Sequence, residues 1–302
     1  MSVDEQAGVL ALVKATEGEW YRTAALIEEA GSALRLIRRE WSALETAPDD
    51  HVKALVARVT QDDLAAAHAQ IEEQQARRIR LATVLDDTYP ANLSAIYNRP
   101  PFIWLRGDVV SADRRSIAIV GTRTASEQGL EHGRWFGQEL AKREVTVLSG
   151  LARGIDTAAH TAALDAGGRT VAVLGHGLSR PVYPPENGSL ADRIATQGAL
   201  ASQFWPDAPP TRYSFPMRNV VMSGMAVGTV VVEASETSGA KMQGRLCLEH
   251  GKRLFLLESL VARESWAQAY AERPGATIVT DVEDIIEVLA ELAAEPEQLA
   301  LC

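Results

Sequence analysis

Short, continuously apolar runs alternate with helix-length segments through most of this chain. The runs lie at 117–120, 145–148, 170–174, 200–204, 229–232, 254–257 and 277–279. The segments with helical patterns lie at 130–142, 155–166, 188–196, 220–227 and 241–250. Strands that are apolar throughout, rather than at every second residue, are typical of a parallel sheet that is covered on both faces. The alternation therefore predicts an α/β domain with a doubly wound, mostly parallel sheet.

The chain before this alternation has a different pattern. Residues 8 to about 82 are predicted to be helical, with Gly31 ending one segment. Thr60 and Asp63 form a capping box that starts a helix running to Leu81. A short strand is predicted at 103–105, and a closing helix at 281–294. These patterns divide the chain into a small helical domain (1–82), the α/β domain (83–294) and a tail (295–302).

The overall charge limits what kind of nucleic-acid binding is possible. The 302 residues carry a formal net charge of −10. Phosphate backbones are repelled on average by such a protein, which excludes nonspecific coating of DNA or RNA. A basic pocket can still dominate within a Debye length of roughly 8 Å at physiological salt. Nucleic acid therefore remains possible only where such a pocket exists.

The location expected from the sequence is the cytoplasm. No apolar run is long enough to span a bilayer, so no membrane partner is expected. Residues 1–6 lack the basic-then-apolar order of a signal peptide. Cys247 and Cys302 lie far apart in the sequence. Two distant cysteines favour a reducing compartment over a structural disulfide.

Small and polar loops follow several of the predicted strands. They are 121–124, 149–154, 175–177 and 233–239. Ligands of doubly wound sheets bind beyond the carboxyl ends of the strands, near a switch in strand order. Glycine in these loops permits close approach of a ligand to the backbone. Their succession favours a phosphate-type ligand at this edge of the sheet.

The segment 149–160 carries the most information among these loops. It passes from an apolar run through small residues into a helix, which leaves backbone N–H groups unpaired at the positive end of the helix dipole. Arg123 and Arg153 are the best anion partners, because a guanidinium grips phosphate through two parallel hydrogen bonds. A surface ion pair with a carboxylate is the alternative for each.

Three titratable side chains near these loops are harder to interpret. Asp156 lies in the first helical turn, where stabilisation of the dipole and a functional role are both open. His160 is expected to pack inside the structure. His176, between two glycines, is expected to be more exposed, with ligand contact open.

A second feature is the proline-rich segment 209–219, which contains Arg212, Tyr213, Phe215 and Arg218. Aromatic faces stack unpaired bases at about 1–3 kcal/mol each, and interleaved arginines hold the backbone. This pattern suits single-stranded nucleic acid. The alternative is that the two aromatic residues seal the edge of the sheet.

The sequence lacks the motifs of common nucleotide-binding, zinc-binding and hydrolase sites. The G-x-G-x-x-G dinucleotide fingerprint and the G-x-x-x-x-G-K-[ST] phosphate loop are both missing. No cysteine and histidine spacing suggests zinc, and no serine has the G-x-S-x-G setting of a hydrolase nucleophile. We therefore expect no cofactor and no metal.

Several segments together resemble the DprA (Smf) family of DNA-processing proteins. They are 119–123, 149–156, 172–178, 183–187, 215–219, 231–234 and 238–239. The resemblance implies a Rossmann-like domain behind a small helical domain. It also implies a homodimer that binds single-stranded DNA and loads the RecA recombinase during natural transformation, without catalysis.

The resemblance also assigns roles to residues. It implies that Arg123 contacts DNA, that Arg212 touches the backbone, and that Phe215 packs on a base. Together with the loops described above, the candidate DNA-binding residues are Gly121, Thr122, Arg123, Ser149, Gly150, Arg153, Gly154, His176, Arg212, Phe215, Arg218, Asn219, Ser238, Gly239 and Lys241.

The chain departs from the family pattern at Val220, Ala240 and Glu258, among other positions. An alternative thus stays open: a nucleotide sensor, or a phosphoribohydrolase-like enzyme, with a role such as phage defence. That enzyme group uses a Pro-Gly-Gly-x-Gly-Thr-x-x-Glu run. Only Gly228, Thr229 and Glu233 match its end, with a longer spacing to the glutamate.

Overall fold

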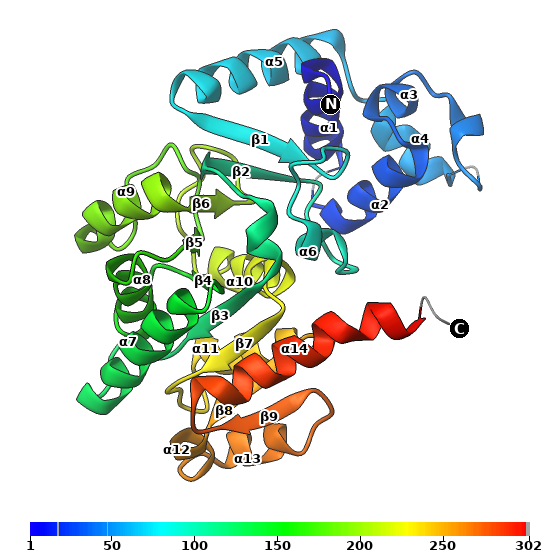
Figure 1. Cartoon of the computed structure of the whole chain (residues 1–302). Helices are drawn as coiled ribbons and strands as arrows, with labels where there is room; N and C mark the ends of the chain where they lie inside the picture. Colours follow the sequence, from blue (N-terminus) through cyan, green and yellow to red (C-terminus); the bar gives the residue numbers. More distant parts are fainter. Residues whose placement is uncertain (17, 47, 300–302) are drawn as a thin grey trace.

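A computed structural model describes residues 1–16, 18–46 and 48–299 of the chain. Its centre is a nine-stranded sheet in the order β1-β2-β6-β5-β4-β3-β7-β8-β9 (Figure 1). The strands are β1 (Ile79–Thr83), β2 (Phe102–Gly107), β3 (Ser116–Val120), β4 (Thr146–Ser149), β5 (Thr170–Val173), β6 (Ala199–Ser202), β7 (Gly228–Val231), β8 (Arg253–Leu257) and β9 (Ala276–Val279). The predicted doubly wound, mostly parallel sheet is confirmed.

The strand order places a switch point beside β3. Strands β3, β4, β5 and β6 follow one another outward in one direction, and the chain then returns to place β7, β8 and β9 on the other side of β3. All these neighbours pair in parallel, whereas β1 and β2 add an antiparallel edge next to β6. The crevice beyond the carboxyl ends of β3 and β7 is where such sheets bind ligands.

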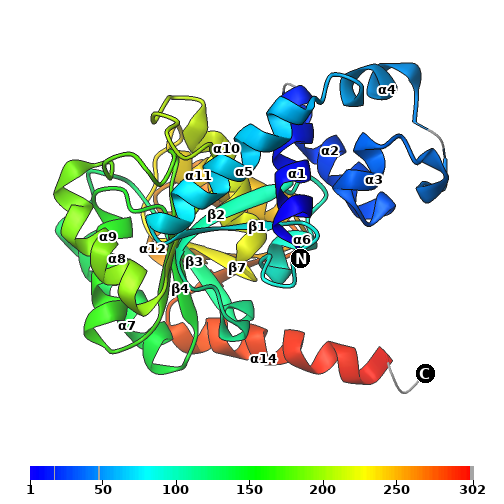
Figure 2. The same ribbon diagram turned by 90° about the horizontal axis from the view of Figure 1, so that it is seen from above.

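Helices cover both faces of the sheet (Figure 2). On one face, α7 (Glu127–Lys142) packs on α8 (Ile155–Asp165), beside α9 (Gly188–Gln197). On the other face, α10 (Ser214–Met225) packs on α11 (Gly239–Glu249) and on α6 (Ala91–Ser94). Within the described part of the chain, no helix combines the length and apolar character needed to cross a membrane.

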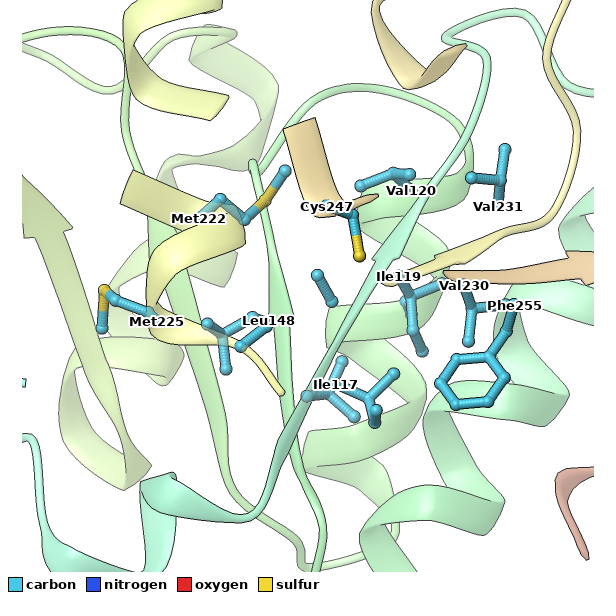
Figure 3. Packing of buried hydrophobic residues seen from close by; sticks show 14 of the residues in the cluster. Ile117, Ile119, Val120, Leu148, Met222, Met225, Val230, Val231, Cys247 and Phe255 are labelled. Carbon is cyan, nitrogen blue, oxygen red and sulfur yellow. The ribbon is translucent and has the colours of Figure 1, made fainter. Parts of the chain in front are cut away.

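The main core lies between the sheet and these helices. All five residues of β3 are buried, which explains the uninterrupted apolar run at 117–120. Met222 and Met225 of α10 and Cys247 of α11 lie among the strand side chains (Figure 3). Burial raises the pKa of the Cys247 thiol to about 12, so this thiol stays protonated. The other cysteine, Cys302, lies outside the described residues.

The N-terminal helices form a second core against β1 and β2. They are α1 (Val3–Ala15), α2 (Trp20–Ala30), α3 (Ala33–Ile37), α4 (Asp50–Val56) and α5 (Gln61–Ala76). The Thr60–Asp63 capping box is present, and Gly31 ends α2 with a positive φ of 64°. Trp104 of β2 and Ile71 of α5 are both fully buried in this core.

The predicted extension of α5 to Leu81 is wrong. The helix ends at Ala76, and residues 79–83 form the edge strand β1, paired with β2. Ile79 and Leu81 are buried while Arg80 between them is exposed, which is a strand period rather than a helical one. The domain boundary expected at 82 therefore falls inside a strand of the sheet.

Three other elements differ from expectation. Helix α10 begins at Ser214, before the start of the helical segment predicted at 220–227. The helices α12 (Glu258–Val261) and α13 (Ser265–Ala271) occupy a stretch with no predicted structure. Helix α14 (Val282–Leu299) extends beyond 294 into the expected tail, of which residues 300–302 lie outside the described part.

His160 makes the stability of the fold sensitive to acid. Its ring is fully buried in α8, as expected, with Nδ1 2.6 Å from the Thr170 hydroxyl. That hydroxyl donates its own proton to the Val147 carbonyl, so it must accept a hydrogen bond from a protonated Nδ1 of His160. The Nε2 atom is then unprotonated, and it is buried without a hydrogen-bond partner among the described residues. Burial lowers the pKa of His160 to about 3.

We expect the free energy of unfolding to fall as the pH is lowered from about 6.5, because only the unfolded chain then takes up the proton. The loss from one such histidine approaches about 1.4 kcal/mol per pH unit between its unfolded and folded pKa values. Urea denaturation at pH 7 and pH 5 tests this with His160→Gln. The difference in unfolding free energy between the parent protein and His160→Gln should be smaller at pH 5 than at pH 7. An unchanged difference would contradict a buried, neutral His160.

Candidate nucleic-acid interface

The loops after β3 and β4 are packed directly against each other. Gly154 holds them together, because it has a positive φ of 75° and a Cβ there would lie 2.5 Å from the Thr122 carbonyl oxygen. The Ile155 amide donates to that same oxygen at 3.5 Å. The Thr122 amide donates to the Glu233 carbonyl oxygen at 2.7 Å, which ties in the loop after β7. The loops after β3, β4 and β7 therefore lie together at one edge of the sheet, as expected.

The anion expected at the start of α8 is a carboxylate of the chain itself. Asp156 is buried, and one of its oxygens accepts hydrogen bonds from the Gly150 amide at 3.1 Å and the Ala152 amide at 3.2 Å. The prediction that the Gly150 amide contacts phosphate is thus wrong, because that donor is already used. Burial raises the pKa of Asp156, while the nearby Arg218 opposes that rise.

Arg218 lines the cavity at the switch point as a buried, hydrogen-bonded residue. Because α10 starts at Ser214, Arg218 lies on its inner side and is only 7% exposed. Its Nη1 donates to the Val173 carbonyl at 2.8 Å, and its Nε donates to Asn219 Oδ1 at 3.0 Å. A Cβ at Gly150 would lie 1.6 Å from that Nη1, so only glycine leaves room for the guanidinium. Burial lowers the pKa of Arg218, and the negative charge of Asp156 counteracts this.

Arg123 is the exposed cation of the site. Its guanidinium carbon lies 5.1 Å from the centre of the Phe215 ring, within cation–π range. Across the described ranges, it has no carboxylate within ion-pairing distance. Arg123 lines a cavity of about 310 Å³ at the switch point and a smaller one of about 30 Å³ beside Tyr183. An unpaired guanidinium beside an accessible aromatic ring suits a nucleotide phosphate next to its base.

Two aromatic side chains, Phe215 and Tyr183, lie beside this guanidinium. Phe215 is half-buried, and its ring centre lies 6.1 Å from that of Tyr183, which is 43% exposed. Further along the loop, Arg212 lies over the exposed ring of Tyr213, with its guanidinium carbon 4.6 Å from the ring centre. Tyr183 was missed as a site residue, although its place in the 183–187 motif was a signal. The exposed faces of these rings make a platform on which bases can stack.

Two predicted site residues face away from solvent. The expectation that His176 is exposed is wrong, since only 1% of it is accessible. Its Nδ1 donates to the Gly177 carbonyl, and its Nε2 accepts from the Tyr183 amide at 3.3 Å. Ser149 is fully buried, and its hydroxyl donates to the Ile119 carbonyl at 2.6 Å. His176 therefore positions Tyr183, and Ser149 fastens β4 to β3.

Other predicted contacts are paired with acidic side chains. Arg153 forms an ion pair with Glu186, which lowers the pKa of that carboxyl. Lys241, in the first turn of α11, is paired with Glu236. Ser238 caps α11 by accepting from the Ala240 amide at 3.1 Å, and it lines the larger cavity together with Gly121, Thr122, Asn219 and Gly239. The surface ion pair considered for Arg153 is present, whereas Arg123 has no such pair among the residues that the structure describes.

Glu233 is held in a structural position. Its carboxylate accepts from the Ser126 hydroxyl at 2.6 Å and from the Ser126 amide at 3.2 Å, at the start of α7. A Cβ at Gly129 would lie 2.1 Å from this carboxylate, so the helix leaves a gap for it. This is the glutamate that the phosphoribohydrolase alternative requires, and its hydrogen bonds do not favour that alternative.

Comparison with known proteins decides the family. The family model described as DNA recombination-mediator protein A matches residues 80–290. The chain belongs to this family. Protein Smf of Escherichia coli is 40% identical over 203 residues, which are 67% of this chain and 54% of that protein. The DNA processing protein DprA of Streptococcus pneumoniae is 36% identical over 205 residues, which are 68% of this chain and 72% of that protein. The chain thus matches only about half the length of the Escherichia coli relative.

Solved structures of family members show the same fold. The crystal structure of DprA from Streptococcus pneumoniae aligns with a TM-score of 0.71 at 27% identity, covering 95% of this chain and 98% of that one. A structure of DprA from Helicobacter pylori, described as giving insight into a unique single-stranded DNA binding mode of that protein, aligns with a TM-score of 0.61 at 24% identity. It covers 70% of this chain and 96% of that one. The Rossmann-like fold inferred from the resemblance is confirmed.

Proposed function

We propose that this member of the DNA recombination-mediator protein A family binds single-stranded DNA at the carboxyl ends of β3, β4 and β7. The observation that carries the proposal is the position of Arg123, exposed, without an acidic partner among the described residues, and stacked on Phe215. A phosphate at this guanidinium would place the neighbouring base near Phe215 and Tyr183. The single-stranded DNA binding mode described for the Helicobacter pylori protein supports the same class of ligand.

We call the two cavities lined by Arg123, at the switch point and beside Tyr183, the furrow. The surrounding charges favour binding that starts at this furrow over binding elsewhere on the acidic surface. The chain as a whole is acidic, with a net charge of −10, and Arg153, which lines the smaller of these cavities, is paired with Glu186. Because phosphates are held by guanidiniums, we expect binding to depend strongly on salt, with a slope of roughly −0.7 in log affinity per log salt for each phosphate held. We propose that the role is binding rather than catalysis, because Glu233 is engaged by Ser126.

The proposal extends to the finer role that the family resemblance implies. As a homodimer in the cytoplasm, the protein would hold an unpaired strand during recombination or transformation and assist RecA in binding it. Mass measurement of the purified protein tests the dimer. Capture of RecA with and without oligo-dT tests the partner, and a monomer that never retains RecA would remove this part of the proposal.

The ligand class is tested by fluorescence anisotropy on one purified sample. Oligo-dT, a duplex of the same length and a panel of free nucleotides are compared at equal salt. We expect oligo-dT to bind tightest and free nucleotides to compete weakly. A nucleotide that binds tightly and displaces oligo-dT would instead favour the sensor alternative.

Glu186 is expected to limit the affinity of the site. Glu186→Gln removes the partner of Arg153 and frees its guanidinium for phosphate. Exposed ion pairs contribute little stability, so we expect an unchanged fold and oligo-dT affinity increased by about two- to fivefold. Anisotropy titration measures the gain. Glu131→Gln, on an exposed part of α7, is the charge-matched control and should change affinity less. Equal affinities of the Glu186 variant and the parent protein would show that Arg153 takes no part in binding.

A further inference from the structure

A wide groove runs between α7 and α8, next to the proposed site. Its volume is about 730 Å³, more than twice that of the cavity at the switch point. Arg123 lines both, and Arg153 lines the groove as well as the small cavity beside Tyr183. The groove is thus continuous with the furrow at these two guanidiniums.

The groove carries positive charge that no carboxylate of the described part of the chain neutralises. Arg134 of α7 lines it and is exposed, and no carboxylate of the described residues lies within ion-pairing distance of it. The acids lining the groove are Asp165 and Glu186. Asp165 is paired with Arg193 at 2.6 Å, and Glu186 is paired with Arg153. Arg123 and Arg134 therefore line one depression of an acidic protein, and neither has an acidic partner among the described residues.

The floor of the groove is open to a bulky ligand. It is made by small side chains of α8, namely Thr157, Ala158, Thr161 and Ala162. These residues leave space above the helix, and their methyl groups offer a surface for sugars or bases. A single small anion would occupy only one of the two guanidiniums, whereas a polyanion can contact both.

We propose that the groove between α7 and α8 takes further nucleotides of the strand held at Arg123, with a phosphate at Arg134. This inference rests on the proposed function and deepens it, because it sets the direction and length of the bound strand. The strand leaves Phe215, passes Arg123 and Arg153, and continues along α8. The protein then contacts a longer stretch of the DNA strand than the furrow alone could hold.

The test compares Arg134→Ala on two lengths of oligo-dT, about 4 and about 16 nucleotides, which bracket common single-strand site sizes. We expect affinity for the longer strand to fall about fivefold, and its salt slope to lose about 0.7, the contribution of one phosphate. Affinity for the shorter strand should not change. The control is Arg22→Ala, which removes one exposed positive charge from α2, far from α7 (Figures 1 and 2).

A second variant probes the floor without touching an arginine. Ala162→Glu places a carboxylate in the groove, on a half-buried helical position. It should also weaken only the longer strand, by repelling its phosphates.

The outcomes separate the two proposals. If both variants bind both lengths like the parent protein while Arg123→Ala weakens both, the groove proposal is overturned and the proposed function stands. Equal losses for both lengths would place Arg134 in the primary site and also overturn the extension. If neither length binds to the parent protein, the proposed function fails, and the groove proposal fails with it.

Discussion

Arg123→Ala is expected to weaken oligo-dT binding by about 10- to 100-fold and to leave the fold intact. A hydrogen bond to a charged group contributes about 1.5–3 kcal/mol, which corresponds to this range of affinity. Arg123 is exposed and lies over the half-buried ring of Phe215, so its removal leaves no buried charge without a partner. Anisotropy gives the affinity, and the urea midpoint gives the stability.

Arg123→Lys is the informative companion to this variant. Lysine keeps the positive charge but loses the planar fork that grips two phosphate oxygens and stacks on the aromatic ring. We expect an affinity between those of the parent protein and the alanine variant. If alanine binds as tightly as arginine, phosphate recognition at this residue is ruled out. If alanine lowers the urea midpoint strongly, Arg123 has a structural role that the geometry does not show.

Arg218→Met is expected to destabilise the protein by roughly 3 kcal/mol or more. Removing one of two buried opposite charges takes away the compensation of the other, and breaking such a pair typically costs about 3–5 kcal/mol. Here the other charge is Asp156, which keeps its hydrogen bonds from the Gly150 and Ala152 amides but loses the neighbouring positive charge, and the Val173 carbonyl also loses its donor. Equilibrium urea unfolding measures the loss.

A double variant shows whether the charge of Asp156 causes the loss of stability in Arg218→Met. Adding Asp156→Asn removes that charge, so the double variant should be more stable than the sum of the two single losses predicts. Arg212→Ala is the matched control, because this arginine is exposed and its removal should hardly change the midpoint. Strict additivity of the two single variants would mean that Arg218 and Asp156 do not interact.

The order of strands and helices could be predicted because it depends on local patterns. Continuous apolar runs identified β3 through β9, and the capping signals at Thr60 and Gly31 placed helix ends correctly. The error at β1 has a physical cause, since a short apolar segment after a helix fits both periods. Only the pairing of Ile79 and Leu81 with β2 makes it a strand, and that contact lies outside the local sequence.

The candidate site was predictable in position but not in the roles of its polar residues. The exposed position of Arg123 beside Phe215 agrees with the expectation from the strand-end loops. Arg218 and His176 are buried because the chain supplies distant partners, the Val173 carbonyl and the Tyr183 amide. The amides predicted to hold phosphate are filled by Asp156, which residue spacing alone left undecided. Burial of polar groups is decided by such tertiary hydrogen bonds, which no local pattern encodes.

The central claim is that one furrow at the carboxyl edge of the sheet holds an unpaired strand. Amide hydrogen exchange with and without oligo-dT tests it most directly, because it maps the contact on the unmodified protein. The account predicts slower exchange in 121–125, 151–154, 183–186 and 211–217, with the N-terminal helices unchanged. Protection confined to residues 1–76, or the absence of any protection at saturating oligo-dT, would contradict it.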